Sequence, residues 1–259
     1  MQLRLRALGL LLVAFSFDRY ASPQGRRIES QNESFTQLNT FGLFAEYSNN
    51  SSHIFLGRTE QRKIASVGAS YSRRLFRVRS GEFRYLFEAR PAFEVSDPFS
   101  NTAYASYDSR RGYNSGSFRN VPSRACHSFS FSSSRTFYHP PNGSYTISLA
   151  ETVTCDRRWT YAQGLSPIGF QFVFRRRQPI RPFVTGNVGY LFSTRPVPLV
   201  DSGSFNFIFA FGAGFELYLH QHRALQLEYR LNHISNNYTA PSNPGIDSNL
   251  LRVAYTFGR

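Results

Sequence analysis

The feature that most constrains this chain is an alternation of apolar and polar residues with a period of two. It is clearest at 206–220, where Phe207, Phe209 and Phe211 share one face of an extended chain and Ala210 and Gly212 share the other. Such alternation predicts β-strands with one apolar face. Most of the candidate segments are about 9–14 residues long, which is enough to cross a bilayer when tilted. They are Thr40–Ser48, Lys63–Phe76, Glu82–Val95, Pro167–Arg176, Pro182–Ser193, Asn206–His220, Arg223–Ser235 and Asn249–Phe257.

The two faces of these segments predict an all-β fold, an eight-stranded antiparallel transmembrane β-barrel. Within Glu82–Val95 the outward set is Phe83, Tyr85, Phe87, Ala89 and Phe93, and the inward set is Arg84, Glu88, Arg90 and Glu94. Charged side chains of opposite sign would fill the lumen of so small a barrel, so we do not expect a pore. The chain is 16% aromatic yet has a mean hydropathy of −0.36, as expected when apolar residues are dispersed along barrel strands.

The lengths of the connections assign the two ends of the barrel. Connections after the second, fourth and sixth strands are short (77–81, 177–181 and 221–222), and the others are longer. Outer-membrane barrels have short periplasmic turns and long outer loops. The longest connection, 96–166, is therefore predicted to be an extracellular loop insertion between the third and fourth strands. The end of the seventh strand falls on the same outer side.

The first 22 residues resemble a secretory signal peptide. Arg4 and Arg6 precede an apolar core at 7–13, and Ala14-Phe15-Ser16 offers a small-x-small cleavage site. The alternative, a membrane anchor, would need a longer apolar run, of about 20 residues. We expect a polar lead-in at 23–38 and a barrel domain at 39–259, exported to the bacterial outer membrane. The alternating C-terminal segment that ends in Phe257 resembles an outer-membrane assembly signal.

The formal net charge of +14 admits a different class, a basic soluble protein that binds nucleic acid. The arginines, however, are spread over strands and loops without forming a helical basic stripe, so we predict no nucleic-acid partner. Arginine also suits bidentate contacts with the phosphates of a lipid headgroup.

The two cysteines, Cys126 and Cys155, lie in the 96–166 insertion. An exported protein meets an oxidising environment, so a disulfide between them is expected. Two unpaired thiols in a flexible loop are the alternative. Cys126, His127 and Cys155 lack a fourth ligand with suitable spacing for zinc, and we predict no metal site.

Three polar residues near the C-terminus suggest hydrolytic chemistry. His233 and Ser235 share the apolar face of the seventh strand, and Asp247 has the parity of the apolar face of the eighth. An imidazole beside a serine hydroxyl can take its proton during nucleophilic attack, and a carboxylate can hold the imidazole tautomer. An isolated His-x-Ser is more often structural, and spacing alone does not make Asp247 the partner of His233.

The same segment resembles a known family. His233-Ile234-Ser235-Asn236, followed by Asn243-Pro244-Gly245-Ile246-Asp247, is similar to the C-terminal signature of the PagL-type outer-membrane lipid A 3-O-deacylases. The resemblance implies Ser235 as nucleophile, His233 as base and Asp247 as the acidic member, with Asn236, Asn243 and Gly245 supporting an oxyanion hole. The best-known members carry Glu where this chain has Asp247, which is one methylene shorter, so its loop must sit closer to the histidine.

The expected function is therefore that of a serine esterase that removes an ester-linked 3-hydroxyacyl chain from lipopolysaccharide. The partners are lipopolysaccharide and outer-membrane lipids, the active site lies at the outer leaflet, and no cofactor is required. The alternative is a non-enzymatic outer-membrane barrel with an adhesive or structural role through its long outer loop. The sequence makes no prediction of oligomeric state.

Overall fold

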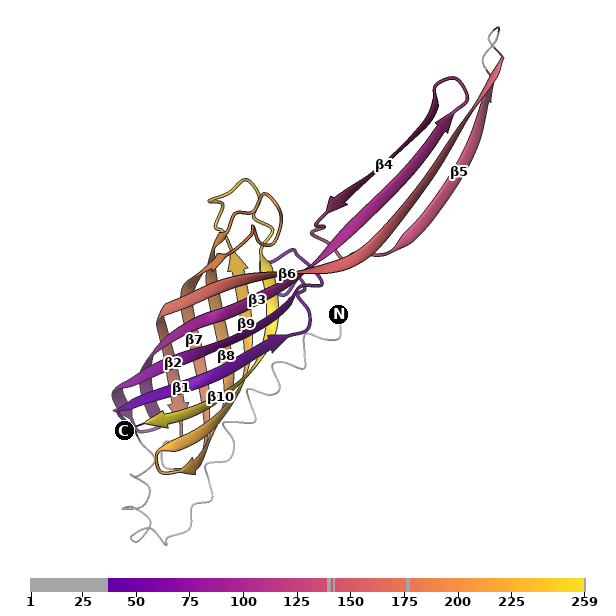
Figure 1. Ribbon diagram of the computed structural model, residues 1–259. Coiled ribbons are helices and arrows are strands. Elements are labelled where there is room, and N and C mark those ends of the chain that lie inside the picture. The colour runs from indigo at the N-terminus through magenta and orange to yellow at the C-terminus, as the bar shows by residue number, and fades with distance from the viewer. Residues whose placement is uncertain (1–36, 139–140, 142, 176–177, 259) are drawn as a thin grey trace, which may run out of the picture.

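Eight antiparallel strands close into a barrel in the order β1-β2-β3-β6-β7-β8-β9-β10, with β10 paired back to β1 (Figure 1). The computed structural model describes residues 37–138, 141, 143–175 and 178–258. The predicted signal peptide and the lead-in as far as residue 36 lie outside them. The ring strands are β1 (Asn39–Ser48), β2 (Lys63–Val78), β3 (Gly81–Asp108), β6 (Ser144–Phe174), β7 (Ile180–Ser193), β8 (Phe205–His220), β9 (Arg223–Ser235) and β10 (Ile246–Gly258).

The predicted all-β, eight-stranded barrel is confirmed. The alternation reproduces the bounds of β9, and it places β1, β7 and β8 to within two residues at each end. β10 begins at Ile246, three residues before the predicted start, so Asp247 lies in a strand rather than in the preceding loop. No helix that is long and apolar enough to cross a membrane occurs in the part of the chain that the structure describes.

The stretch 96–166, predicted to be a loop inserted between the third and fourth barrel strands, is mostly sheet in the structure. β3 runs on to Asp108 and β6 begins at Ser144, and they pair with each other beyond the barrel. Two further strands, β4 (Gly112–Asn120) and β5 (Phe129–Tyr138), pair with the outer edges of β3 and β6. The result is a four-stranded extension, β4-β3-β6-β5, that projects from one end of the barrel (Figure 1).

The two faces of the extension differ in chemistry. Residues paired across strands share a face, so Tyr104, Phe131 and Leu149 lie on one face while Ala105, Ala150 and Ser132 lie on the other. The first face carries large apolar side chains that are all at least 36% exposed: Tyr104, Phe118, Phe129, Phe131, Phe137, Ile147 and Leu149. In the part of the chain that the structure describes, no other element covers this apolar face.

A β-bulge near the end of the barrel part of β3 reverses the side-chain orientation that the alternation predicts there. The register shifts between Arg90 and Phe93 in the pairing with β6, and a one-residue slip moves later side chains to the opposite face. Phe93, predicted to face outward, is therefore 1% exposed inside the barrel, whereas Glu94, predicted to face inward, is exposed.

Buried ion pairs fill the middle of the lumen, as the alternation predicts. Arg230 on β9 contacts Glu46, Glu88 and Glu228 at 3.1, 2.8 and 2.9 Å. Arg90 and Arg252 join the same carboxylates, and a second group contains Glu82, Arg84, Arg181 and Glu216. Since these side chains are almost fully buried, each charge depends on its neighbours for compensation.

An apolar cluster lies inside the barrel at the end that carries the extension. It lies level with the last residues of β9 and the first residues of β10, as Ile234 and Ile246 show. Its members are Ile64, Phe93, Val95, Ala162, Leu191, Val197, Ile208, Ile234, Ile246 and Leu250. Together with the ion pairs it packs the interior with side chains, in agreement with the expectation that the barrel forms no pore.

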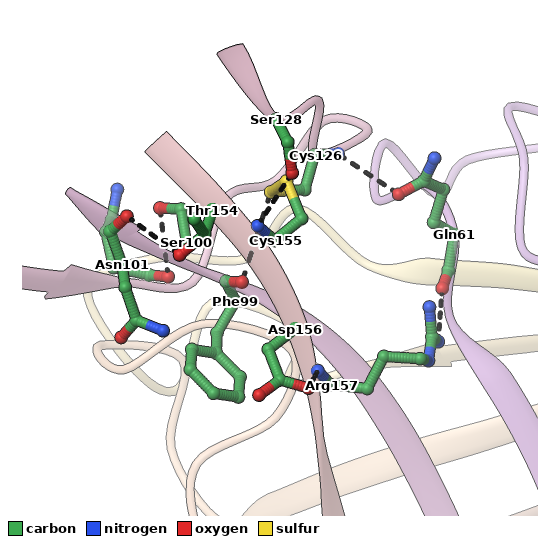
Figure 2. Close-up of a disulfide and its surroundings, with 11 residues drawn as sticks. Gln61, Phe99, Ser100, Asn101, Cys126, Ser128, Thr154, Cys155, Asp156 and Arg157 are labelled. Atoms are coloured by element: carbon green, nitrogen blue, oxygen red, sulfur yellow. Dashed lines mark hydrogen bonds between the residues drawn. A yellow bond between two sulfur atoms is a disulfide. The ribbon is translucent and has the colours of Figure 1, made fainter. Parts of the chain in front are cut away.

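The predicted disulfide between Cys126 and Cys155 is present at the base of the extension (Figure 2). It joins the β4–β5 connection to β6 over a sequence separation of 29 residues. The backbone N–H of Cys126 donates to Gln61 Oε1 at 3.1 Å, and Arg157 donates to the carbonyl oxygen of Gln61 at 2.6 Å. The base of the extension is thus attached to the β1–β2 connection.

Candidate active site

The end of β9 presents His233 and Ser235 on the outer face of the barrel. The residues before them on this face, from Leu225 to Leu231, are exposed and apolar, and the alternating residues point into the lumen. His233 and Ser235 are both half-buried. Side chains two apart on a strand point the same way, about 6.5–7 Å apart at Cα, so the imidazole and the hydroxyl are neighbours at the rim of an apolar surface.

Asp247 is directly opposite His233 in the ladder between β9 and β10. Its Oδ1 lies 2.5 Å from Nδ1 of His233, and the two side chains are 3% and 15% exposed. Opposed residues in an antiparallel pair bring their Cβ atoms within about 4.5–5.5 Å, so a carboxylate as short as that of Asp reaches the ring. This contact leaves Nε2 as the ring nitrogen that can serve a neighbouring hydroxyl.

The connection between β1 and β2 covers the carboxylate of Asp247. The backbone N–H of Phe55 donates to Oδ2 at 2.5 Å, and the N–H of Gly57 also donates to the carboxylate. The N–H of Ser52 donates to the backbone carbonyl of Asp247 at 3.1 Å. Although Asp247 has the parity of the outer face, it is therefore only 2% exposed.

Asn236, predicted to support the oxyanion, organises the loop that follows β9. Its side chain is 1% exposed; Nδ2 donates to the carbonyl oxygens of Ser202 and Ser242, and Oδ1 accepts the N–H of Tyr238 at 2.9 Å. Its backbone N–H donates to Oδ1 of Asn243 at 3.1 Å. That N–H, the first after Ser235, is thus already engaged.

Asn243 and Gly245 lie beside the pair formed by His233 and Asp247. Because Oδ1 of Asn243 accepts the N–H of Asn236, its amide nitrogen is the part of the side chain that can donate to a ligand. Gly245 has a φ of +63°, which favours glycine, and a Cβ there would lie 3.1 Å from Cε1 of His233. The glycine lets the loop pass close to the imidazole.

Sequence reasoning missed the contribution of the β1–β2 connection. Phe55 and Gly57 precede Asp247 by about 190 residues, and they act through backbone N–H groups that any residue except proline carries. No motif or alternation in that segment indicates such a role. Ser235, His233 and Asp247 could be named as candidates because their side-chain chemistry and spacing are visible in the sequence.

The described residues contain no group of three or more His, Cys, Asp or Glu side chains that could hold a metal ion. The site contains the hydroxyl of Ser235, the imidazole of His233 and the buried carboxylate of Asp247, the first two on β9 and the third on the neighbouring β10. This order of groups suits proton transfer from a nucleophilic serine.

A family model described as lipid A 3-O-deacylase (PagL) matches residues 127–256. The match covers half of the chain and includes Ser235, His233 and Asp247. The chain belongs to the lipid A 3-O-deacylase family. No curated protein matches the chain.

One solved structure supports the same fold, and two others show a weaker likeness. The crystal structure of the outer membrane enzyme PagL has a TM-score of 0.50 at 13% identity and covers 84% of this chain and 99% of its own. Neisserial surface protein A has a TM-score of 0.39 at 12% identity, covering 85% and 97%. The outer membrane protein OprG from Pseudomonas aeruginosa has 0.37 at 9% identity, covering 87% and 99%.

Family and fold together place this lipid A 3-O-deacylase family member in the bacterial outer membrane. The exposed aromatic and aliphatic side chains on the outer face of the barrel strands, Phe209, Phe211 and Phe215 on β8 among them, then face lipid. This agrees with the localisation predicted from the alternation and from the lengths of the connections.

Proposed function

We propose that this protein is a serine esterase that removes an ester-linked 3-hydroxyacyl chain from the lipid A part of lipopolysaccharide. The observation that carries the proposal is the contact between His233 and Asp247, with Ser235 on the same face two residues further along β9. These residues fall within the part of the chain that matches the deacylase family.

In the proposed reaction, Ser235 Oγ attacks the carbonyl carbon of the ester. His233 takes the hydroxyl proton through Nε2 and passes it to the sugar oxygen as the C–O bond breaks, leaving the acyl chain on Ser235. Water then attacks the acyl-enzyme, His233 takes its proton, and that proton returns to Ser235 as the hydroxy fatty acid leaves. Asp247 holds the tautomer of His233 and stabilises its cation in both halves of the reaction.

The negative oxygen of the tetrahedral intermediate needs hydrogen-bond donors, each worth about 3–4 kcal/mol in comparable sites. We assign this role to the amide nitrogen of Asn243, because its Oδ1 is held by the backbone N–H of Asn236. Asn236 itself is assigned a structural role, since both ends of its side chain bind the loop. No cofactor takes part in this mechanism.

The position of the site on the barrel supports a lipid substrate. Ser235 ends β9 at the same end of the barrel as the extension and the long connections, which is the outer side in barrels of this kind. The site faces outward, level with the last exposed apolar residues of β9. The proposal therefore places the reaction at the outer leaflet, where acyl chains reach the protein laterally.

The test compares refolded wild type with Ser235→Ala, each incubated with lipopolysaccharide in detergent, followed by mass spectrometry of the lipid A. Wild type should release one hydroxyacyl mass, and Ser235→Ala should be slower by several orders of magnitude, as expected when a triad nucleophile is removed. Ser133→Ala, in the exposed part of the extension, is the matched control and should retain full activity.

A second candidate function is adhesion through the extension. The observation that favours it is the uncovered apolar face with Phe118, Phe129 and Phe131, since large exposed apolar patches mark interaction sites. If wild type, shown to be folded by heat-modifiable migration, leaves lipid A unchanged, the esterase proposal fails and adhesion becomes the better explanation. Adhesion would survive Ser235→Ala.

A further inference from the structure

We infer that Phe55 and Gly57 position Asp247 for catalysis; the two residues lie in residues 51–59 of the β1–β2 connection, here named the clamp loop. The inference rests on the proposed function, because it concerns the acidic member of the same triad. It adds residues that lie outside the part of the chain matched by the family, 127–256.

The clamp loop follows the start of β10 through backbone contacts. Ser51 forms a bridge with Ser248. The N–H of Arg58 donates to the carbonyl of Pro244 at 2.6 Å, and Thr59 donates to the carbonyl of Gly245 through its N–H at 3.3 Å and its hydroxyl at 2.6 Å. The loop is therefore fixed on both sides of Asp247, which places the N–H groups of Phe55 and Gly57 at its carboxylate.

Gly57 lies against the carboxylate so closely that only glycine fits. A Cβ at this position would come within 2.8 Å of both Cγ and Oδ1 of Asp247, and closer still to its backbone nitrogen. A contact of that kind forces one of the two groups to move. The absence of a side chain at Gly57 thus sets where Oδ1, the atom bound to His233, can lie.

The lipid-facing position of Asp247 explains why such a loop is needed. Beyond Asn249, the residues of the same face on β10, Leu251 and Val253, are exposed to the surroundings of the barrel. A carboxylate among them is costly unless hydrogen bonds compensate its charge. The clamp loop supplies donors and keeps acyl chains away from the carboxylate, while His233 stays half-buried and open to the substrate.

The clamp loop is itself held by the base of the extension. Arg62, which is fully buried, donates to the carbonyl oxygens of Glu60, Ser123 and Pro122. The N–H of Arg62 donates to Oγ of Ser51 at 3.0 Å, and the same hydroxyl donates to the carbonyl of Thr59 at 2.9 Å. Contacts therefore run without a break from the base of the extension to Asp247.

The first test removes one donor without touching the triad. Phe55→Pro deletes the N–H that binds Oδ2, and since the phenyl ring is 74% exposed its loss removes little packing. Ile54→Pro is the matched control, because it deletes an N–H that binds Ser52 within the loop rather than Asp247. We expect kcat to fall about 10- to 100-fold in Phe55→Pro with KM within about twofold, as for a lost hydrogen bond to a charged group. Ile54→Pro should stay within about threefold of wild type.

The second test fills the space beside the carboxylate. Gly57→Ala should lower kcat by a similar factor, whereas Leu56→Ala, at an exposed position next to it, should leave kcat unchanged. Heat-modifiable migration confirms that each variant is folded. If Phe55→Pro does not fold, the comparison of Gly57→Ala with Leu56→Ala tests the inference by itself.

The outcomes separate this inference from the proposed function. A wild type without deacylase activity overturns the proposed function, and the catalytic role of the clamp loop falls with it. An active wild type with Phe55→Pro equal to Ile54→Pro, or Gly57→Ala equal to Leu56→Ala, overturns only the clamp. A rise in KM at constant kcat also contradicts it, because the loop would then bind substrate rather than position Asp247.

Discussion

At the scale of single residues, the length of the acidic side chain is matched to the register of two strands. Asp247 and His233 are directly opposed in the β9–β10 ladder, and their side chains meet at 2.5 Å. The sequence raised a doubt here, since the family signature has a longer Glu at this position. The structure resolves the geometry: β10 begins before Asp247, so the strand itself brings the shorter carboxylate within reach.

Asp247→Glu should therefore lower activity, although it restores the residue usual in the family signature. The longer side chain would have to push its carboxylate toward Gly57 or tilt the imidazole, because the space between the carboxylate and Gly57 does not admit even a Cβ. A displacement of about 1 Å costs roughly 100-fold in rate, and kcat measured on lipopolysaccharide should fall by about that factor. Asp201→Glu, in an exposed loop, is the control; equal activity of Asp247→Glu and wild type would contradict the argument.

The candidate site was predictable only where side chains carry the chemistry. Ser235, His233 and Asp247 follow from parity and from the resemblance to the family signature. The clamp loop does not, because its donors are backbone N–H groups whose position depends on how the β1–β2 connection folds over β10. The loop contacts of Asn236 are equally absent from the sequence pattern, because its side chain binds backbone groups of the loop that follows β9.

At the scale of elements, the barrel strands were predictable and the extension was not. The barrel strands place apolar residues against lipid and polar residues inward, which gives a strong alternation. The extension mixes Ser, Thr, Tyr and Arg with its aromatics, and the middle of one face is made of small residues, as at Ser115, Ala105 and Ser132. Its composition is typical of a loop, and long-range pairing between β3 and β6 is what makes it a sheet.

The base of this extension contains an ion pair that makes stability depend on pH. Asp97, beyond the barrel part of β3, is fully buried with Arg62 at 3.3 Å. Burial raises the pKa of the Asp97 carboxyl from 3.8 to about 6, against the opposing effect of the Arg62 charge. Burial likewise lowers the pKa of Arg62 despite the nearby carboxylate. Desolvation therefore outweighs pairing for both partners.

A raised folded-state pKa fixes the sign of the effect. The stabilising contribution of Asp97 is complete below the pKa of this carboxyl in the unfolded chain, which is near 4, and is lost as the pH rises through about 6. The shift corresponds to about 3 kcal/mol. Trp159, the only tryptophan of the chain, pairs with Ser96 in this region, so urea unfolding followed by its fluorescence at pH 4.5 and 7.5 measures the change.

We expect lower stability at pH 7.5 than at pH 4.5 in wild type and a smaller difference in Asp97→Asn. The Asn variant, which is neutral like the protonated carboxyl, should stay close to wild type at pH 4.5 and be at least as stable as wild type at pH 7.5, because burial penalises the ionised carboxylate more than Arg62 compensates it. Asp201→Asn, at an exposed position, should show the wild-type pH dependence. A wild-type stability that rises between pH 4.5 and 7.5 by as much as in Asp97→Asn would exclude this role for Asp97.

At the scale of the whole molecule, the barrel contains buried charges that are compensated in part by residues of other strands. Glu46 comes from β1, Glu88 from β3, Glu228 and Arg230 from β9 and Arg252 from β10. Their contacts join strands that are far apart around the ring, such as Arg230 with Glu88. The sequence indicated that inward charges would pair, but the partners follow from the closure of the barrel.

Arg230→Met should consequently destabilise the barrel strongly. The change leaves Glu46, Glu88 and Glu228 with less compensation in a buried site, and breaking a buried pair in this way costs about 3–5 kcal/mol. Urea unfolding in detergent, followed by Trp159 fluorescence, should show a midpoint well below that of wild type, whereas Arg223→Met, at an exposed position, should match wild type.

Combining Arg230→Met with Glu228→Gln supplies the decisive comparison. If Arg230 stabilises the barrel by compensating carboxylates, removing one of those carboxylates should recover part of the loss, and the two effects should not add. Additive losses would instead mean that Arg230 acts mainly by filling space in the lumen. The first result ties closure of the ring to the pairing of its charges, since the contacts between the carboxylate of Glu88 on β3 and the guanidinium of Arg230 on β9 form only when the two strands belong to the same closed sheet.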